Sequence, residues 1–283
     1  MTLELPMDRI NQQAWNSRDA WREFNTEKTW SDLGEEAAFA WVAAECAGQP
    51  LLDIGIGAGR TVPLMREIST NYVGIDYTAK LLEQSQRRFP GVDLRLMDAR
   101  DMAALPSDHF ALCAFSWNGI DCVDYEDRER ILREMYRVTK PGGVVLFSSH
   151  NREGPGFQES PRNLLPRFSV NPARFGWRVL RSMHQLPQAV YNYRRNAKLH
   201  RDFEGYSIKT AAAHYFGIVI VYTTLREQRR QLRQLGFAID AVFNSCDGQS
   251  IPEQAQTSDA WWFHFIARKP LTSAPVPDTH PTA

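Results

Sequence analysis

Short runs of apolar residues alternate with longer segments of amphipathic pattern between residues 35 and 151. The short runs are bounded by Gly, Pro, Asp or Asn, and they cover residues 51–55, 72–76, 92–96, 110–115 and 143–149. Continuous apolar runs of this length are typical of parallel strands that are buried on both faces. The longer segments carry apolar residues three and four positions apart, as helices do, and they cover residues 35–47, 79–89 and 126–139. Strands that alternate with helices in this way predict a parallel sheet covered by helices on both faces.

The pattern changes after residue 151. Residues 152–213 contain five prolines and show no strand-like alternation, so we expect a helical insertion after the fifth strand. This insertion has eleven Lys and Arg residues against four Asp and Glu, which gives +7 in a chain whose formal net charge is zero. Regular patterns then return, with a helix at residues 224–235 and strands at residues 214–222, 238–244 and 261–268. We expect these late strands to complete the sheet.

Composition narrows the classes of protein to consider. The 283 residues are 43% hydrophobic and 23% charged, which is typical of an ordinary globular protein of one large or two modest domains. Equal numbers of basic and acidic residues disfavour a protein that holds nucleic acid mainly through phosphate contacts. The sequence has no apolar run of 18 residues and no signal-peptide pattern, and its four cysteines show no CxxC spacing. We therefore expect a soluble, cytoplasmic protein with no membrane partner, no metal site and reduced thiols.

The first expected strand runs into a glycine-rich turn. Residues 53–61 read DIGIGAGRT, with glycines at alternate positions ahead of a helical segment. Such glycines let the backbone turn tightly and approach a ligand closely, although they can also serve a purely structural turn. A dinucleotide-binding fold carries GxGxxG, in which the third glycine brings helix against strand. Here Arg60 occupies that third position and the glycines follow GxGxG, which disfavours an oxidoreductase that uses a nicotinamide cofactor.

Two acidic residues follow the next two strands. Asp76 lies at the carboxyl end of the second strand, where an α/β sheet has its ligand crevice. A carboxylate there can accept hydrogen bonds from both hydroxyls of a ribose, and it can also cap the helix that follows. Asp98 follows the third strand. An acid beside a free backbone N–H suits an adenine, because the acid accepts from the exocyclic amine while the N–H donates to a ring nitrogen; Asp98 can equally be a helix cap.

Together these motifs resemble those of the class I S-adenosylmethionine-dependent methyltransferases. Five pieces stand in the family's order: LLDIGIGAGRT, VGIDYT, LMDARDM, FALCAFSWNGIDCV and RVTKPGGVVLFSSHN. The resemblance covers residues 35–151 and the last strands. It implies an α/β, Rossmann-like class I methyltransferase fold, with a mostly parallel seven-stranded sheet whose late antiparallel strand is residues 261–268. It also implies S-adenosyl-L-methionine as the cofactor and S-adenosyl-L-homocysteine as its product.

The resemblance assigns parts of the cofactor to residues of this chain. The backbone of residues 55–59 would hold the methionine moiety, Asp76 the ribose, and Asp98 with the Ala99 amide the adenine. Residues 115–118 would flank the reactive methyl group. The expected cofactor-binding residues are Asp53, Gly55, Gly57, Gly59, Arg60, Asp76, Tyr77, Asp98, Ala99, Ser116 and Trp117. Methyltransferases of adenine or cytosine amino groups typically carry an Asn/Asp-Pro-Pro-Tyr/Phe-like sequence after the fourth strand, and residues 116–119 read SWNG instead.

The acceptor side offers three candidate catalytic residues. The cofactor's methyl group is already electrophilic, so the protein mainly has to align nucleophile, methyl and sulfur. A base is needed only where the nucleophile must lose a proton. His150, at the end of the fifth strand, is the candidate base, and its alternative role is to hydrogen-bond the loop. Asn118 and Asn151 are candidates for positioning the acceptor.

Specificity is expected from segments outside the core. Three N-terminal tryptophans, Trp15, Trp21 and Trp30, either close over the cofactor or simply pack against the domain. We expect the basic insertion to cap a small acceptor, and its charge hints at an anionic one; the alternatives are a solvated basic face and a dimer contact. The expected substrate-binding residues are Tyr191, Arg194, Arg195, His214 and Tyr215.

These considerations divide the chain into five segments. They are an N-terminal lid or helical extension (1–34), the S-adenosylmethionine-binding core (35–151), the basic insertion as a substrate cap (152–213), the completion of the core sheet (214–269) and a disordered tail (270–283). We expect an enzyme, monomeric or homodimeric, that transfers a methyl group to an oxygen or nitrogen of a small-molecule acceptor by in-line displacement. The alternatives are a methyltransferase of RNA or protein that docks through the basic insertion, and a cofactor-binding regulatory protein without turnover.

Overall fold

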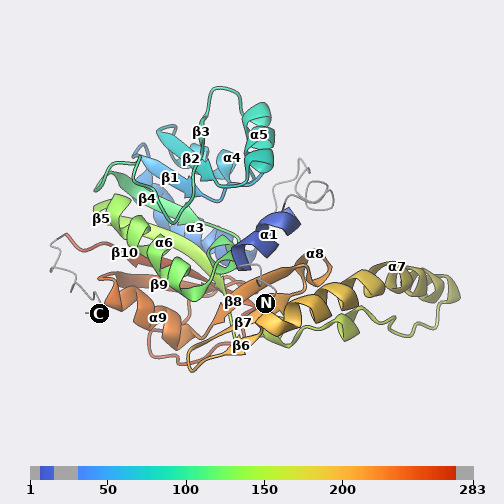
Figure 1. Cartoon of the computed structure of the whole chain (residues 1–283). Coiled ribbons are helices and arrows are strands. Elements are labelled where there is room, and N and C mark those ends of the chain that lie inside the picture. Colours follow the sequence, from blue (N-terminus) through green and yellow to red (C-terminus); the bar gives the residue numbers. More distant parts are fainter. Residues whose placement is uncertain (1–6, 16–30, 272–283) are drawn as a thin grey trace, which may run out of the picture.

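The computed structural model describes residues 7–15 and 31–271, and a seven-stranded sheet lies at its centre (Figure 1). Across the sheet the strands are ordered β3-β2-β1-β4-β5-β10-β9. They are β1 (Leu51–Ile54), β2 (Tyr72–Asp76), β3 (Asp93–Leu96), β4 (Phe110–Phe115), β5 (Thr139–His150), β9 (Ala238–Asn244) and β10 (Trp262–Arg268). Strand β10 runs antiparallel to both neighbours, and the other pairs are parallel. The expected Rossmann-like, mostly parallel sheet is confirmed.

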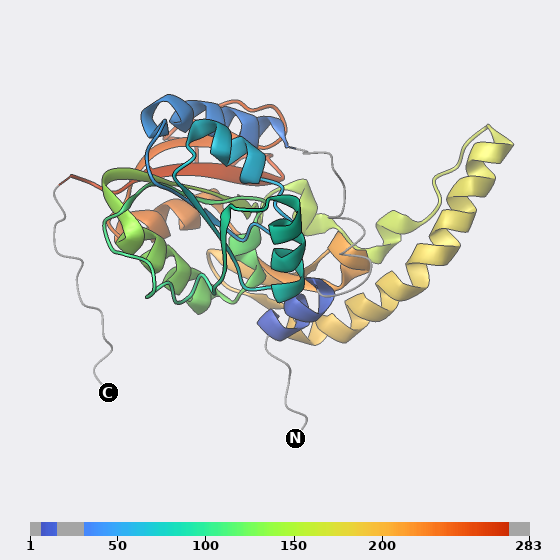
Figure 2. The same ribbon diagram turned by 90° about the horizontal axis from the view of Figure 1, so that it is seen from above.

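Helices cover both faces of this sheet, as the alternating pattern predicts. They are α3 (Leu33–Cys46), α4 (Val62–Ile68), α5 (Ala79–Arg88), α6 (Tyr125–Val138) and α9 (Leu225–Gln234). Apolar residues of α3 and α4 pack in one cluster with Leu51, while those of α6 and α9 pack in another with Phe147. Figure 2 shows α3 and α4 on one side of the sheet and α6 on the other. The carboxyl ends of the parallel strands are therefore the part of the sheet left open for a ligand.

A second, antiparallel sheet of three strands lies beside the core. It consists of β6 (Arg201–Asp202), β7 (Tyr206–Ala211) and β8 (Ile218–Thr223). The N-terminal helix α1 (Met7–Trp15) packs against β8 through the fully buried Asn11. The Asn11 Nδ2 donates to the carbonyls of Cys122 at 2.7 Å and Val219 at 2.6 Å, and its Oδ1 accepts from the Val219 N–H at 2.9 Å. One polar side chain thus ties α1 to two separate parts of the fold.

The expected strand at residues 214–222 is wrong in its start and its sheet. Its first residues form the short helix α8 (Ala213–Phe216), in which His214, Tyr215 and Phe216 have φ of 51°, 54° and 60°. This left-handed backbone cannot continue a strand. Strand β8 then begins at Ile218 and pairs with β7, so it belongs to the second sheet and does not complete the core sheet. Strand β7 lies in the insertion where no strand was expected, although its sequence YSIKTA alternates apolar and polar residues.

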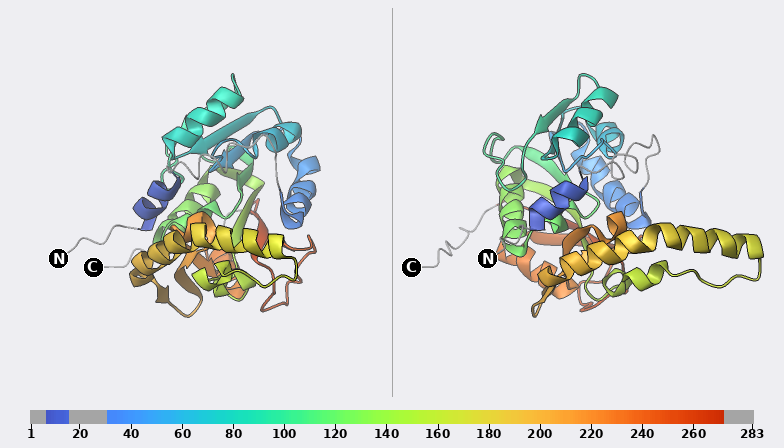
Figure 3. Two further views of the ribbon diagram at one scale, coloured as in Figure 1. Left: turned by 90° about the vertical axis from the view of Figure 1, so that its right-hand side faces the viewer. Right: turned by 45° about the vertical axis from the view of Figure 1, so that its right-hand side comes forward.

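Residues 161–196, which we call the arm, extend outward from the second sheet (Figure 3). The outer part projects away from both sheets, while Ala189, Asn192 and Asn196 near the end of α7 are buried, and the two asparagines donate to carbonyls of α8 (Ala213–Phe216). The arm contains the short helix η3 (Pro161–Leu164), an extended segment and the 25-residue helix α7 (Pro172–Asn196). The two halves are tied where the Ser182 hydroxyl donates to the Leu164 carbonyl at 2.5 Å and Arg178 donates to the Arg167 carbonyl at 3.0 Å. None of the helices in residues 7–15 and 31–271 is long and apolar enough to cross a membrane.

Candidate functional site

The glycine-rich turn between β1 and α4 forms the floor of a pocket at the carboxyl ends of the strands. Gly55, Gly57 and Gly59 have φ of 68°, 54° and 86°, which L side chains rarely adopt. A Cβ on Gly55 would lie 2.5 Å from the Phe115 ring. At Gly57, by contrast, an added Cβ would meet nothing closer than 4.0 Å. The turn therefore needs glycine for its backbone, and at Gly57 it presents bare backbone to open space.

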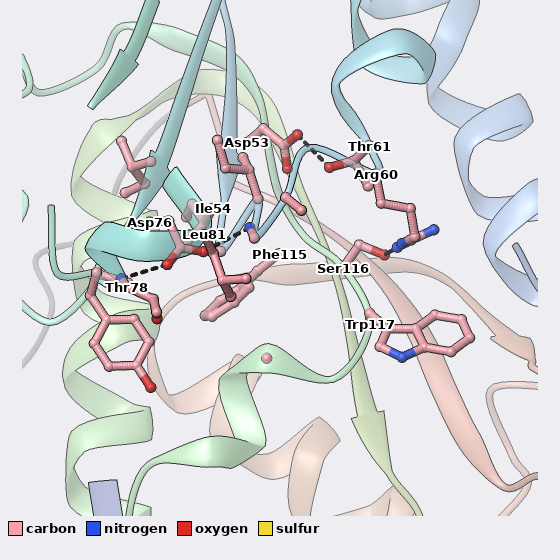
Figure 4. A pocket seen from close by; sticks show the side chains of 18 of the residues that line it. Asp53, Ile54, Arg60, Thr61, Asp76, Thr78, Leu81, Phe115, Ser116 and Trp117 are labelled. Atoms are coloured by element: carbon pink, nitrogen blue, oxygen red, sulfur yellow. Dashed lines mark hydrogen bonds between the residues drawn. The ribbon is translucent and has the colours of Figure 1, made fainter. Parts of the chain in front are cut away.

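Asp76, at the end of β2, lies on one side of this turn (Figure 4). Its Oδ2 accepts from the Gly57 N–H at 2.7 Å and its Oδ1 from the Thr78 N–H at 2.6 Å. The side chain is almost fully buried, and burial raises its pKa above the ordinary value, while the two N–H donors act in the opposite direction. Asp76 lines the pocket, so its remaining lone pairs can accept from a ligand's hydroxyls.

Asp53, in β1, also lines this pocket, and its two carboxylate oxygens have different surroundings. Its Oδ2 accepts from the Thr61 hydroxyl at 2.6 Å and the Tyr72 hydroxyl at 2.8 Å. Its Oδ1 is buried and has no hydrogen-bond partner among the described residues. Burial raises the pKa of Asp53 to about 6, although Thr61 and Tyr72 lower it. Because an unpartnered buried carboxylate oxygen is costly, this atom indicates a place for a ligand's cation or hydrogen-bond donor.

The opposite side of the turn is organised by a residue that the sequence analysis missed. Glu35, in the first turn of α3, is fully buried and holds Arg60 through two bonds of 2.7 Å. Glu35 also accepts from the Ser116 hydroxyl, and the Arg60 guanidinium lies 5.1 Å from the centroid of the Trp117 ring. Figure 4 shows Arg60, Ser116 and Trp117 gathered at this end, away from Asp76. Glu35 carries no local signal, since its position in α3 also suits an ordinary helix-start acid.

Asp98 does not line the main pocket but lines a depression that shares Tyr77 and Met97 with it. Its carboxylate forms an ion pair with Arg100, with 2.7 Å between Oδ2 of Asp98 and Nη2 of Arg100. Arg100 and Asp8 line the same depression. The pKa of Asp98 is below its ordinary value; burial raises it, and the hydrogen bonds and charge of Arg100 outweigh that effect. Ala99 and Tyr77 do line the main pocket. Of the expected adenine site, the structure therefore brings the backbone of residue 99 to the pocket and directs the Asp98 side chain to Arg100.

His150, the candidate base, is oriented by a buried carboxylate. Its Nδ1 lies 2.8 Å from Oδ2 of Asp121, and its backbone N–H donates to the same oxygen at 2.6 Å. Asp121 lies in η1 (Gly119–Cys122), is fully buried, and is held by Arg128 and by the Ser149 hydroxyl at 2.9 Å. The His150 side chain itself is 22% exposed. An imidazole whose Nδ1 is bonded to a carboxylate leaves its Nε2 available, which is the arrangement of an oriented base.

His150 does not line the pocket of the glycine-rich turn, but two aromatic rings connect them. The rings of Trp117 and Trp262 are 5.6 Å apart, and those of Trp262 and His150 are 6.1 Å apart. Trp117 lines the pocket at the Arg60 end. His150 therefore lies beyond this end of the pocket, on the far side of a tryptophan pair.

The two asparagines proposed to position an acceptor have different surroundings. Asn151 is fully buried; its Nδ2 donates to the carbonyls of Ser258 and Ala260, and its Oδ1 accepts from the Glu153 N–H at 2.9 Å. The Asn151 amide therefore holds loops together through these three hydrogen bonds, and it is not available to position an acceptor as expected. Asn118 has φ of 57° directly after Trp117, and its buried Oδ1 has no hydrogen-bond partner in the described part of the chain.

The five expected substrate residues do not line the pocket. Tyr191, Arg194 and Arg195 lie near the C-terminal end of α7, where the neighbouring Asn192 and Asn196 donate to carbonyls of α8. None of the three lines the pocket, so this end of α7 does not cap the site. The other end of α7 projects away from the sheets (Figure 3). His214 and Tyr215 lie in α8, and the His214 ring packs against Trp15 with centroids 4.8 Å apart.

Trp15 does line the pocket, carried there by α1. Of the three tryptophans expected to close over the cofactor, Trp21 and Trp30 lie outside the described residues. The N-terminal segment thus contributes one aromatic ring to the site, and the missed residue Asn11 holds that helix in place.

Comparison with known proteins shows which family this part of the chain matches. The family model described as a methyltransferase domain matches residues 52–147, which include the glycine-rich turn, Asp76 and Trp117. A probable S-adenosylmethionine-dependent methyltransferase of Mycolicibacterium smegmatis is 28% identical over 148 residues, which is 49% of this chain and 52% of that protein. Residues 52–147 therefore form a methyltransferase domain of the class I S-adenosylmethionine-dependent type.

Other members of this methyltransferase family differ from one another in name and substrate. A ubiquinone biosynthesis O-methyltransferase of Thiobacillus denitrificans is 28% identical over 151 residues, which is 48% of this chain and 62% of that protein. The chain thus spans between half and two thirds of the length of these two relatives. The crystal structure of a Burkholderia thailandensis 1,6-didemethyltoxoflavin-N1-methyltransferase has a TM-score of 0.56, at 11% identity over 95% of this chain and 92% of that one. At this identity the likeness supports the fold alone.

The pocket of this methyltransferase domain fits the family's cofactor in chemical terms. S-adenosylmethionine is a cation at its amine and sulfonium, a diol at its ribose and a flat base at its adenine. The unpartnered Oδ1 of Asp53 suits the amine, and Asp76 suits the diol. The bare backbone at Gly57 leaves space for a ligand between them. The described residues contain no group of three His, Cys, Asp or Glu side chains that could hold a metal ion.

Proposed function

We propose that this chain binds S-adenosylmethionine in the pocket of the glycine-rich turn and transfers its methyl group to an oxygen or nitrogen of a small-molecule acceptor. The observation that carries the proposal is the buried, unpartnered Oδ1 of Asp53 in a pocket that also contains Asp76. One carboxylate meets the amine and the other meets the ribose hydroxyls. The cofactor supplies an electrophilic methyl group on sulfur, and the protein holds it in line with the acceptor.

The acceptor in this proposal approaches from the Trp117 end and loses a proton to His150. The acceptor's lone pair forms the new bond to carbon, the carbon–sulfur bond breaks, and the proton goes to the His150 Nε2. The Asp121 carboxylate accepts a hydrogen bond from the Nδ1–H of His150, so that Nε2 is the nitrogen that takes up the proton. The same carboxylate stabilises the imidazolium that forms. The acceptor would then lie beside the rings of Trp117 and Trp262, between the pocket and His150, and these rings favour the exclusion of water.

A small acceptor is supported by the name of one similar protein, an O-methyltransferase of ubiquinone biosynthesis. No arginine of the arm lines the pocket, so these cations give no support to a negative charge on the acceptor. The proposal therefore requires a dissociable proton on the acceptor and not a charge.

The test uses methyl-labelled S-adenosylmethionine, the purified full chain and a cell extract divided into small-molecule and macromolecular fractions. We expect label in the small-molecule fraction, entering about 10² times more slowly with the His150→Gln variant at matched protein concentration. Label in RNA or protein overturns the acceptor class. Binding of S-adenosylhomocysteine by calorimetry without label in either fraction indicates a cofactor-binding protein without turnover, and preferential binding of NAD overturns the cofactor.

A further inference from the structure

The arm carries a combination of charge and exposed apolar surface that the methyl-transfer site does not use. Residues 161–196 contain seven arginines and no acidic residue, and the nearest acids are Glu159 and Asp202. The arm also contains large apolar side chains that are more than half exposed: Leu165, Phe168, Val170, Trp177, Leu180, Met183 and Tyr191. Contiguous exposed apolar groups on a projecting element mark an interaction surface.

The exposed apolar residues of α7 share one side of the helix. Trp177, Leu180 and Met183 follow one another at intervals of three residues, which keeps them along one stripe. Arg174 and Arg181 are seven residues apart, so they share a neighbouring side. Arg181 also lies over the Trp177 ring, with 5.5 Å between the guanidinium and the ring centroid. Another side of the same turns packs against the extended segment that precedes α7, where the Phe168 and Phe175 rings lie 5.7 Å apart.

We propose that the arm docks on the surface of an anionic lipid bilayer, with its apolar stripe in the headgroup region and its arginines on the lipid phosphates. Helices with Trp and Leu on one side and Arg beside them bind at such interfaces without spanning the membrane. Anionic lipids attract each nearby Arg by about 1 kcal/mol, or roughly fivefold in binding. The proposal departs from the expectation of no membrane partner, which rested on the lack of a spanning segment.

Charge complementarity selects the bilayer over the other occupants of such a surface. Two arms of this chain would bring seven arginines against seven with no acidic residue between them, which disfavours a second copy. A nucleic acid would use the arginines but would leave Leu180, Met183 and Val170 exposed to water. An anionic bilayer is both charged and apolar at its surface, so it satisfies both sets of side chains.

The test is co-sedimentation of the full chain with vesicles of phosphatidylcholine alone and of phosphatidylcholine mixed with phosphatidylglycerol. We expect binding to the mixed vesicles, little binding to the neutral ones, and a loss of binding as salt rises. Trp177→Ser with Leu180→Ser should lower binding about tenfold or more, because two large side chains lose their apolar environment. Arg174→Gln with Arg181→Gln should lower it by about the same factor.

Two matched pairs serve as controls. Trp41→Ser with Leu271→Ser removes the same residue types from other surfaces, where the side chains are 54% and 80% exposed, against 61% for Trp177 and 68% for Leu180. Arg87→Gln with Arg133→Gln removes two exposed arginines from α5 and α6. Both control pairs should bind vesicles like the unaltered chain, and circular dichroism checks that all variants are folded.

Three results overturn the proposal. The first is no binding of the unaltered chain to mixed vesicles, and the second is an equal loss of binding in arm and control pairs. The third is that the unaltered chain does not bind vesicles but forms a dimer in analytical ultracentrifugation, or a complex with single-stranded RNA. In that case the arm pairs of substitutions should disrupt the dimer or the RNA complex. Affinity for S-adenosylhomocysteine should be the same in all variants, so a failure of this proposal is distinct from a failure of the proposed activity.

Discussion

At the scale of single residues, the site depends on carboxylates whose surroundings differ. Asp53 keeps one oxygen without a partner, Asp76 uses both oxygens on backbone N–H groups, and Asp121 is enclosed by Arg128 and His150. Burial raises the pKa of Asp53 to about 6 and also raises the pKa of Asp76 above its ordinary value. Because the hydrogen-bond partners of the three acids differ, substitution of each one separates their roles experimentally.

Cofactor binding should weaken as pH falls through about 6. Burial raises the pKa of Asp53 to about 6, so below this pH the carboxyl takes up a proton and loses its attraction for an amine. Calorimetric titration with S-adenosylhomocysteine across this range measures the effect. Asp53→Asn should bind more weakly and without this pH dependence. Tyr72→Phe should move the midpoint to higher pH, because the Tyr72 hydroxyl stabilises the carboxylate; an unchanged pH profile in Asp53→Asn would contradict the assignment.

Asp76→Ala should weaken the binding of S-adenosylhomocysteine about tenfold or more. The substitution removes an ionised acceptor from the ribose hydroxyls, and hydrogen bonds to charged groups are each worth roughly 1.5–3 kcal/mol. Asp93→Ala is the matched control, because Asp93 lies at the start of β3 and pairs only with the exposed Arg95. Equal affinities of the two variants by calorimetry would rule out the ribose role.

His150→Gln should lower kcat by a factor of about 10² or more and leave cofactor affinity unchanged, since general-base catalysis contributes 10²–10⁴-fold. Asp121→Asn should also lower kcat, because the amide cannot hold the Nδ1 proton as the carboxylate does. His109→Gln, an exposed histidine before β4, is the control. Melting curves accompany Asp121→Asn, since it leaves the buried Arg128 without its ion pair. A kcat for His150→Gln equal to that of the control would reduce His150 to a structural role.

At the scale of elements, α1 is the segment whose position matters most for the pocket. Helix α1 brings Trp15 to the site. Three hydrogen bonds of Asn11 attach this helix to the rest of the fold. Because β8 and η1 both receive these bonds, a helix that is distant in sequence is fixed to the element that carries Asp121. Apolar packing adds to this hold, since Met7 of α1 packs with Val219 and Val221 of β8.

Asn11→Ala should loosen α1 and weaken cofactor binding. The Val219 N–H and the carbonyls of Val219 and Cys122 lose their partners, and each unsatisfied buried group costs about 1–3 kcal/mol. Hydrogen exchange should show faster exchange across residues 7–15, with the core sheet unaffected. Gln13→Ala, on the exposed side of the same helix, should behave like the unaltered chain. Slow exchange in Asn11→Ala would contradict this role.

The sequence predicts the core elements well because their signals are local. The apolar runs that become β1, β2 and β4, and the glycines that follow β1, each need only neighbouring residues to be recognised. Asn11, Glu35 and Asp121 were missed because their roles arise from contacts with residues far away in the chain. The left-handed turn at His214 also has no local signal, since neither Gly nor Asn marks it.

At the scale of the whole molecule, the strands whose ends line the pocket and the helix α7 of the arm occupy different parts of the fold (Figure 1). The pocket lies at the carboxyl ends of the central strands, while the arm leaves the second sheet and projects outward. They share no lining residue among those described. This separation predicts that vesicle binding and cofactor binding vary independently, which the paired variants of the arm test directly.

The connection between β5 and β9 extends from residue 150 to residue 238 and carries the second sheet, the arm and α9. The entropy needed to close a flexible loop grows only with the logarithm of its length, so doubling such a loop costs about 0.6 kcal/mol. A core held by the pairing of β5 with β10 can therefore accept a longer or shorter excursion at this point with little change in stability. The same catalytic sheet can carry appendages of very different reach, and its surroundings can change while its chemistry is kept.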